Sequence, residues 1–287
     1  MLGRHLTRAV DAQHRWSKPL GEFNHRWLGA LFHPIRPVQN FLNGTWLGHP
    51  VHAAVTDVPI GAMTVSLIAD VIGQPVVADV ALLIGVLAMV ASAVTGAADY
   101  AEVDGTPRDR ATVHSAIMVV SLVVYAISLA IRSGGPTGRA IPIALAVVGY
   151  LLLTLGAAIG GDLVYLAGTH VNRHAWRGAG AKWIKVDLGG LADIPEGGPT
   201  KVKAGINDLA VIRNGDRILA VHAQCAHAGG PLAEGTIVGD ALECPWHGSR
   251  FRLADGHVVR GPAMYDQPAY DLRPAEAGGW EARRRPA

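Results

Sequence analysis

Four long apolar runs constrain the fold of this chain more than any other feature of its sequence. They cover residues 53–73, 77–99, 112–132 and 140–163. A helix rises about 1.5 Å per residue, so each run is long enough to cross the roughly 30 Å of hydrocarbon in a bilayer. The connections between the runs are short, which makes successive helices antiparallel neighbours. The sequence therefore predicts an α-helical transmembrane four-helix bundle.

The composition agrees with a chain that is partly inside a membrane. Hydrophobic residues make up 50% of the 287 residues, charged residues only 17%, and the mean hydropathy is +0.26. These values are too apolar for an ordinary soluble protein of two domains. The formal net charge is +2, and the basic residues form no long stripe. We therefore expect a lipid bilayer as a partner and no nucleic acid.

Residues 1–48 form a basic and aromatic segment without the continuous apolar core of a signal peptide. Phe23, Trp27 and Leu31 fall on one face at helical spacing. A basic amphipathic segment beside a membrane domain is typical of a helix that lies along the lipid headgroups. The alternative is a poorly ordered tail.

Lysine and arginine are more frequent in the segments that would lie on one side of the membrane. The N-terminal tail, the polar 100–111 loop and the segment after the fourth run carry them, whereas the opposite side carries only Arg132 and Arg139. Because such residues favour the cytoplasmic side, both termini should be cytoplasmic. This predicts a multi-pass protein of the cell inner membrane with its C-terminal domain in the cytosol.

From Trp183 onward the apolar runs become short and alternating, with turn signals between them. Asn214-Gly215 and Asp255-Gly256 each separate two such runs, which is typical of β-hairpins. The C-terminal part is therefore expected to be a small all-β domain. The expected domains are a basic amphipathic N-terminal segment (1–48), a four-helix membrane domain (49–168), a linker (169–182) and the β domain (183–285).

Two short motifs in the β domain combine cysteine with histidine. Cys225 and His227 form a C-x-H pair, and Cys244 and His247 form a C-x-x-H pair. Two thiolates and two imidazoles on two loops can hold a tetrahedral zinc ion. They can equally hold a [2Fe-2S] cluster in which the cysteines bind one iron and the histidines bind the other.

The residues around these pairs resemble one family closely. C-A-H-A-G-G-P-L, starting at Cys225, and C-P-W-H-G-S-R-F, starting at Cys244, are similar to the ligand loops of the Rieske iron–sulfur family. The resemblance covers roughly residues 182–285. It implies a [2Fe-2S] cluster with Cys225 and Cys244 on the inner iron. His227 and His247 would bind the outer iron and face solvent.

The same resemblance implies roles for residues around the cluster. Gly261 and Pro262 match the family's third, proline-containing loop, which covers the cluster. Ser249 keeps a hydroxyl that bonds a bridging sulfide in high-potential members, whereas Phe251 replaces a tyrosine that bonds a cysteine sulfur. Respiratory members carry a disulfide at the places that here read Gly230 and Trp246, and this chain has only two cysteines. These departures resemble the ferredoxin-like branch and suit a reducing compartment.

The membrane half, with His49-Pro50 and Asp57-Val58-Pro59 near the first helix, resembles a family of bacterial four-helix membrane proteins. That resemblance implies no activity. His52 and His114 should lie at comparable depth near the cytoplasmic side and, with three aspartates, could converge on one site: Asp57, Asp99 and Asp162. A haem b held by the two histidines, a quinone site and a set of structural hydrogen bonds are the open alternatives. Asp70 and Asp79 flank the opposite turn and are expected to be solvated.

The leading functional hypothesis is a membrane-anchored carrier of single electrons between a cytosolic redox partner protein and a haem or quinone in the membrane. Such a protein would be an electron-transfer component of an oxidoreductase system. A Rieske oxygenase needs a further iron held by two histidines and a carboxylate, and the only histidine after His247 is His257. The alternative is a membrane-bound redox sensor whose cluster acts as a switch.

Overall fold

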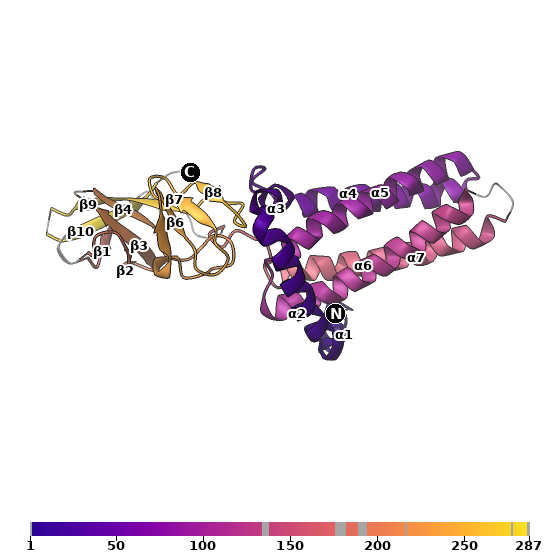
Figure 1. The fold of residues 1–287 in the computed structure, drawn as a ribbon, viewed down its shortest axis with the longest axis horizontal. Helices are drawn as coiled ribbons and strands as arrows, with labels where there is room; N and C mark the ends of the chain where they lie inside the picture. The colour runs from indigo at the N-terminus through magenta and orange to yellow at the C-terminus, as the bar shows by residue number, and fades with distance from the viewer. Residues whose placement is uncertain are drawn as a thin grey trace. The chain divides into compact units, whose positions relative to one another are not determined.

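The computed structural model describes residues 2–133, 138–175, 182–188, 194–215, 217–276 and 278–285. The chain divides into two compact units. One unit contains residues 1–43 and 50–169, and the other contains residues 44–49 and 170–287. The described part of the first unit is built from helices, and that of the second is built mainly from strands (Figure 1).

Four long helices form the core of the first unit: α4 (Val51–Val71), α5 (Pro75–Tyr100), α6 (Gly105–Arg132) and α7 (Ala140–Tyr165). All four are long and apolar enough to cross a membrane. α4 pairs with α5 and α6 pairs with α7, so the bundle consists of two antiparallel hairpins (Figure 1). The predicted four-helix bundle is confirmed.

Helix α6 begins earlier than its apolar run. Its first turns contain Arg108, which pairs with Asp104 at 3.3 Å, and Arg110, which pairs with Asp11 of α1 (Leu2–Asp11) at 2.7 Å. Pro107 fits here because an amide in the first turn of a helix has no intrahelical partner. The prediction of a loop over 100–111 is therefore wrong from residue 105 onward. The hydropathy pattern marks only the apolar part of the helix and does not include its polar first turns.

Residues 2–43 are helical: α1 is followed by α2 (His14–Phe32), a short 3₁₀ turn η1 (His33–Ile35) and α3 (Arg36–Asn43). One face of α2 packs on the bundle, where a Cβ on Gly21 would lie 2.7 Å from Oγ1 of Thr112. The other face carries an exposed apolar stripe with steps of three and four residues: Trp16, Leu20, Phe23, Trp27 and Leu31. The predicted amphipathic face is confirmed.

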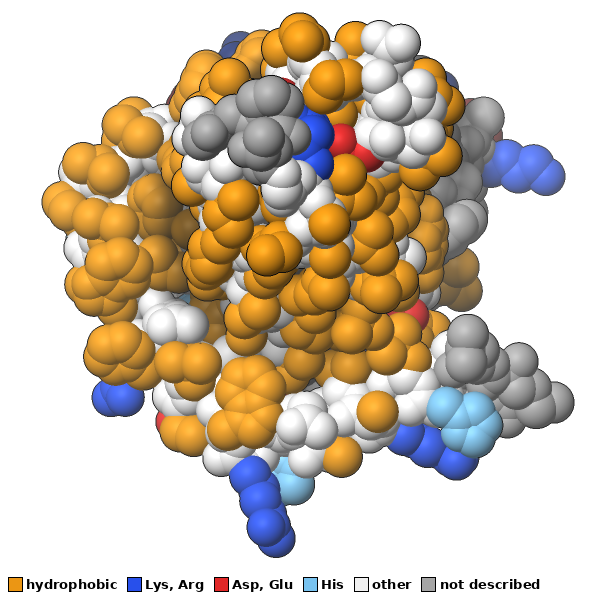
Figure 2. Space-filling model, turned by 90° about the vertical axis from the view of Figure 1, so that its right-hand side faces the viewer, with side chains coloured by type: hydrophobic (Ala, Val, Ile, Leu, Met, Phe, Trp, Pro, Cys, Tyr) orange, Lys and Arg blue, Asp and Glu red, His pale blue; other side chains and the backbone are white. Residues whose placement is uncertain are grey.

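The bundle end formed by the α4–α5 and α6–α7 turns holds a network of four charged side chains. Nη1 of Arg132 lies 3.0 Å from Oδ1 of Asp70 and 2.9 Å from Oδ1 of Asp79. Arg139 pairs with both aspartates as well. The side chains of Arg132 and Asp70 are 1% and 2% exposed, so the expectation of a solvated aspartate is wrong for Asp70. The Asp79 side chain is 33% exposed but pairs with both arginines. The surface around this end is mostly hydrophobic (Figure 2), which favours pairing of these charges.

The second unit contains ten described strands in two sheets. A closed barrel has the order β1-β10-β9-β4-β3-β2, and a four-stranded sheet has the order β5-β6-β7-β8. The strands are β1 (Ile184–Val186), β2 (Pro199–Ala204), β3 (Asn207–Asn214), β4 (Arg217–His222), β5 (Thr236–Val238), β6 (Ala241–Glu243), β7 (Arg250–Arg252), β8 (Val258–Arg260), β9 (Ala269–Pro274) and β10 (Trp280–Arg284). The antiparallel pairs β3–β4 and β7–β8 confirm both predicted hairpins.

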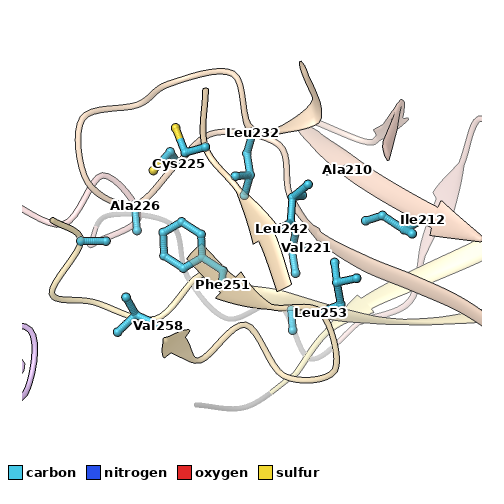
Figure 3. Packing of buried hydrophobic residues seen from close by; sticks show 13 residues of the cluster. Ala210, Ile212, Val221, Cys225, Ala226, Leu232, Leu242, Phe251, Leu253 and Val258 are labelled. Atoms are coloured by element: carbon cyan, nitrogen blue, oxygen red, sulfur yellow. The ribbon is translucent and has the colours of Figure 1, made fainter. Parts of the chain in front are cut away.

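Strand β3 connects two apolar cores. Successive side chains of a strand point to opposite faces, so Leu209 and Val211 enter the barrel core whereas Ala210 and Ile212 enter a second cluster. That second cluster includes Cys225, with Phe251 and Leu232 close to it in Figure 3. The candidate ligand loops therefore rest on a packed apolar base.

Candidate metal centre

The two cysteine–histidine loops have the same backbone design. The first follows β4, and the second connects β6 to β7. In each, the cysteine carbonyl accepts a hydrogen bond from a glycine four residues later, at 3.0 Å from Gly229 and at 3.0 Å from Gly248. Both glycines have positive φ, of 83° and 74°, a conformation that glycine adopts without strain. The two loops thus present their ligand pairs in equivalent turns.

The cysteine sulfur atoms are buried and face each other. Cys225 and Cys244 are 1% and 2% exposed, and their side chains are hydrogen-bonded to one another. Backbone N–H groups also donate to the sulfurs: those of His227 and Ala228 to Cys225, and those of Trp246 and His247 to Cys244. These donors stabilise negative charge on sulfur, which is what a thiolate ligand of iron requires.

The hydrogen bond between the two thiols shifts their pKa values in opposite directions. It lowers the pKa of Cys244 to about 6, with help from the backbone N–H groups of Trp246 and His247 and against the effect of burial. The same hydrogen bond, together with burial, raises the pKa of Cys225. Within the pair, the negative charge is therefore favoured on Cys244 over Cys225.

The two histidine rings of the motifs lie next to each other. The centroids of His227 and His247 are 5.0 Å apart and their planes meet at 88°. His247 is half-buried, but His227 is only 8% exposed. The expectation that both histidines face solvent is therefore wrong for His227. The ring of His170, centred 6.2 Å away, is one of its neighbours.

Residues 170–174 pack on the first ligand loop. The backbone N–H of Arg173 donates to the Ala226 carbonyl at 3.2 Å, and Nε2 of His174 donates to the Gln224 carbonyl at 2.8 Å. The Tyr265 hydroxyl donates to the carbonyl of His170. These residues fall inside the predicted linker, whose composition gave no sign of such contacts. They help to explain why His227 is buried.

Gly230 touches the second ligand loop. A Cβ on Gly230 would lie 2.9 Å from Sγ of Cys244 and 3.1 Å from the Trp246 ring, which leaves no room for a side chain. Both cysteines of the chain are free thiols. The two positions at which the resemblance implies a disulfide in respiratory members are therefore in contact here, through a glycine and an indole.

The third loop is tied to the second ligand loop through Ser249. Its Oγ accepts a hydrogen bond from the backbone N–H of Ala263 at 2.9 Å, which leaves the hydroxyl hydrogen available for another acceptor. Gly261, Pro262 and Ser249 are all buried. Phe251 is fully buried in the apolar cluster beneath the cysteines (Figure 3).

Gln267 was not identified from the sequence, yet it supports the first ligand loop. Its Oε1 accepts from the Ala226 N–H at 2.9 Å, and its Nε2 donates to the carbonyls of His222 and Gln224 at 2.6 Å each. The side chain is 1% exposed. A lone glutamine before a strand is too common a sequence feature to indicate this role.

The polar residues of the membrane half do not gather as one cluster. Asp57 is exposed, and Asp162 accepts a hydrogen bond from Thr7 at 3.0 Å. His52 and His114 each bond a backbone carbonyl of the neighbouring helix, at 2.9 and 2.8 Å. The described residues contain no group of three or more His, Cys, Asp or Glu side chains placed to hold one metal ion. The donor set on the two β loops suits a cluster with two protein ligands per iron.

Comparison with known proteins identifies both halves of the chain. Residues 183–271 match the model of the Rieske [2Fe-2S] domain, and residues 48–173 match that of a predicted membrane protein family, DUF2231. Ferredoxin CarAc from Metapseudomonas resinovorans is 33% identical over 95 residues, which cover 33% of this chain and 87% of the relative. The ferredoxin component of the naphthalene 1,2-dioxygenase/salicylate 5-hydroxylase systems from Ralstonia sp is 31% identical over 91 residues, or 32% of this chain and 86% of the relative. The solved ferredoxin of carbazole 1,9a-dioxygenase from Nocardioides aromaticivorans IC177 is 26% identical, with 37% of this chain and 99% of that one covered and a TM-score of 0.31.

Proposed function

The chain belongs to the Rieske [2Fe-2S] family through residues 183–271, and from this premise we propose that it is a membrane-anchored carrier of single electrons. The carrier would connect a cytosolic redox partner protein with a donor or acceptor in the membrane. The observation that carries the proposal is the pair of buried cysteine sulfurs, each hydrogen-bonded by two backbone N–H groups, beside two neighbouring imidazoles.

We propose that Cys225 and Cys244 bind one iron of the cluster and that His227 and His247 bind the other. The cluster, when bound, supplies a one-electron redox couple. The backbone N–H groups around the cysteines and the Ser249 hydroxyl would stabilise the more negative, reduced state. Phe251, Gly261 and Pro262 would exclude water around it, since all three are buried.

The half-buried ring of His247 gives a route between the cluster and a partner. Among the two histidines of the motifs it is the more exposed, so we propose that the cytosolic partner docks over His247 rather than His227. Relatives named as ferredoxin components of dioxygenase systems support a partner protein that exchanges electrons with the cluster domain. The membrane donor or acceptor would be a haem or a quinone in the domain over residues 49–168.

The distribution of basic residues supports a cytoplasmic position for both termini and for the cluster domain, over residues 183–285, in the inner membrane. A reporter that fluoresces only in the cytosol should be bright when fused after Ala287 and dark when inserted after Ser133. The reverse pattern would place the cluster on the far side.

An EPR and optical redox titration of the purified full-length protein tests the carrier function. The cluster should be reduced and reoxidised by small mediators over many cycles with no loss of signal. His227→Cys and His247→Cys should retain iron but move the EPR spectrum toward an all-thiolate ferredoxin and lower the potential. An unchanged spectrum would contradict the ligand assignment, and a cluster that is lost or rebuilt in each cycle would favour a sensor.

A further inference from the structure

The two hairpins of the bundle are copies of one pattern. Positions of α4 match positions 62 residues later in α6, and positions of α5 match positions 64 residues later in α7. The matched pairs are His52 and His114, Met63 and Tyr125, Ser66 and Ser128, Asp70 and Arg132, Gly85 and Gly149, and Gly96 and Gly160. The glycines make matched contacts, because Gly85 lies against Met63 as Gly149 lies against Tyr125, and Gly96 lies against His52 as Gly160 lies against His114. Ser66 donates to the Ala78 carbonyl and Ser128 to the matched Pro142 carbonyl, at 2.8 and 2.6 Å. A feature present in both copies therefore occurs twice at one depth in the bundle.

Each copy contains one histidine, and the two histidines make matched contacts with the backbone of the neighbouring helix. Nδ1 of His52 lies 2.9 Å from the Ser92 carbonyl, and Nδ1 of His114 lies 2.8 Å from the carbonyl of Gly156, the matched residue. A Cβ on Gly96 would lie 2.9 Å from the His52 ring, and one on Gly160 would lie 3.2 Å from the His114 ring. Both imidazoles thus lie directly against glycine on the neighbouring helix.

These contacts fix the tautomer of both rings. A carbonyl oxygen can only accept, so Nδ1 carries the proton and Nε2 of the neutral ring presents a lone pair. Neither Nε2 has a hydrogen-bond partner among the described residues. Histidines that bind metal usually donate their other N–H to a carbonyl or a carboxylate in this way.

Both histidines lie on the core face of their helices. Eleven residues make about three helical turns, so His52 shares a face with Met63 and His114 shares a face with Tyr125. Met63 and Tyr125 are buried in one apolar cluster built from both hairpins. The two imidazoles lie about three turns away from that cluster along the same faces of α4 and α6. They are therefore on the faces through which the two hairpins pack against each other.

We propose that His52 and His114 are the two axial ligands of an iron tetrapyrrole, a b-type haem, held between the hairpins. The assignment rests on the proposed function and deepens it, because it names the redox group in the membrane. A haem iron receives four nitrogens from its own ring and needs only two from the protein, which is the number that the repeat supplies.

Other ligands match the pair less well. Structural or catalytic zinc takes three or four protein ligands, and no third ligating side chain converges with the histidines in the described ranges. A quinone headgroup needs donors at its two carbonyl oxygens, whereas each Nε2 here offers a lone pair. Two equivalent imidazoles, one from each copy of a repeat, suit a planar group with two equivalent faces.

The test uses the full-length protein purified in detergent from haem-replete cells. Optical spectra, extracted haem and the cluster EPR signal are measured on the same sample. We expect roughly one haem per chain, with sharp α and Soret bands on reduction. His52→Ala and His114→Ala should each lower the haem content by about tenfold or more, with the cluster signal unchanged. His33→Ala, which changes an exposed histidine outside the bundle, is the matched control and should keep the haem.

Two glycine variants and one ligand probe separate ligation from a general loss of folding. Gly96→Val and Gly160→Val should displace the rings and alter the haem bands. Carbon monoxide should bind the residual haem of reduced His52→Ala but not the haem of the wild-type protein, whose iron has both axial positions filled. A haem-free protein with an intact cluster signal would overturn the haem site and leave the carrier function standing. Quinone that co-purifies with the wild-type protein and is lost in the His52 and His114 variants would do the same. Haem bound in a protein that never holds a cluster would overturn the carrier function and leave the haem site standing.

Discussion

The bundle and the β unit use their backbones in opposite ways. In the bundle, helical N–H and C=O groups bond each other, so polar contacts between helices depend on side chains such as Ser128, Arg132 and Asp70. In the β unit, the ligand loops leave N–H groups available, and these donate to the sulfurs of Cys225 and Cys244.

This difference determines what each unit loses when one residue changes. In a loop site the backbone donors remain after a substitution, so only the ligands themselves are irreplaceable. In a membrane helix each polar side chain depends on a particular partner, and removing one partner leaves the other uncompensated. A substitution at the β-unit site should therefore affect mainly the binding of the cluster, and a substitution of a polar residue in the bundle should affect mainly the free energy of unfolding.

The largest effect should follow from loss of a thiolate ligand. Cys225→Ser and Cys244→Ser should each abolish the cluster EPR signal, because a serine oxygen is a poor ligand for the iron of this cluster. The helical circular dichroism of the bundle should persist in both variants. A cluster retained at wild-type level in either variant would contradict the assignment.

A substitution in the charged network should destabilise the bundle without touching the cluster. Asp70→Asn removes a partner of both Arg132 and Arg139 at a site where Arg132 is 1% exposed. We expect a loss of roughly 3–5 kcal/mol in the free energy of unfolding, measured in detergent by denaturant titration. Asp57→Asn, at an exposed position of the same helix, is the control and should change little. Equal stability of the two variants would mean that the network does not hold this end together.

Gln267 tests whether one side chain can contribute as much to the stability of the β unit as Asp70 contributes to that of the bundle. Gln267→Leu removes three hydrogen bonds and leaves the Ala226 N–H without its partner. We expect a loss of roughly 2–3 kcal/mol in the stability of the β unit and faster release of the cluster on heating. Gln74→Leu, at an exposed turn of the bundle, should be neutral within about 0.5 kcal/mol. A Gln267→Leu protein as stable as wild type would weaken the contrast between backbone and side-chain support.

The smallest effects should be on the potential. Ser249→Ala should lower the reduction potential by roughly 40 mV, since one hydrogen bond to the reduced cluster is worth about 1 kcal/mol and 59 mV corresponds to about 1.4 kcal/mol for one electron. Phe251→Tyr should raise it by a similar amount if the new hydroxyl reaches a cysteine sulfur. Protein-film voltammetry measures both values. A rise in Ser249→Ala would mean that the hydroxyl does not donate to the cluster.

The helices and the ligand loops could be predicted because their signals are local. A run of apolar residues indicates a spanning helix wherever its neighbours lie, and Cys225 with His227 is recognisable within three residues. Gln267 and residues 170–174 could not be predicted, because they act through hydrogen bonds to a loop some 40 to 50 residues away in the chain. Nothing in their own composition marks them.

The sequence by itself determined the four membrane helices, the β domain and the cysteine–histidine pairs, since each depends on residues that are neighbours in the chain. The tertiary structure decided that His227 is buried, that Asp70 and Asp79 pair with two arginines, and that His52 and His114 have matched surroundings. These facts depend on which segments meet in space. Burial and pairing are properties of two surfaces in contact, and a one-dimensional pattern describes only one of them at a time.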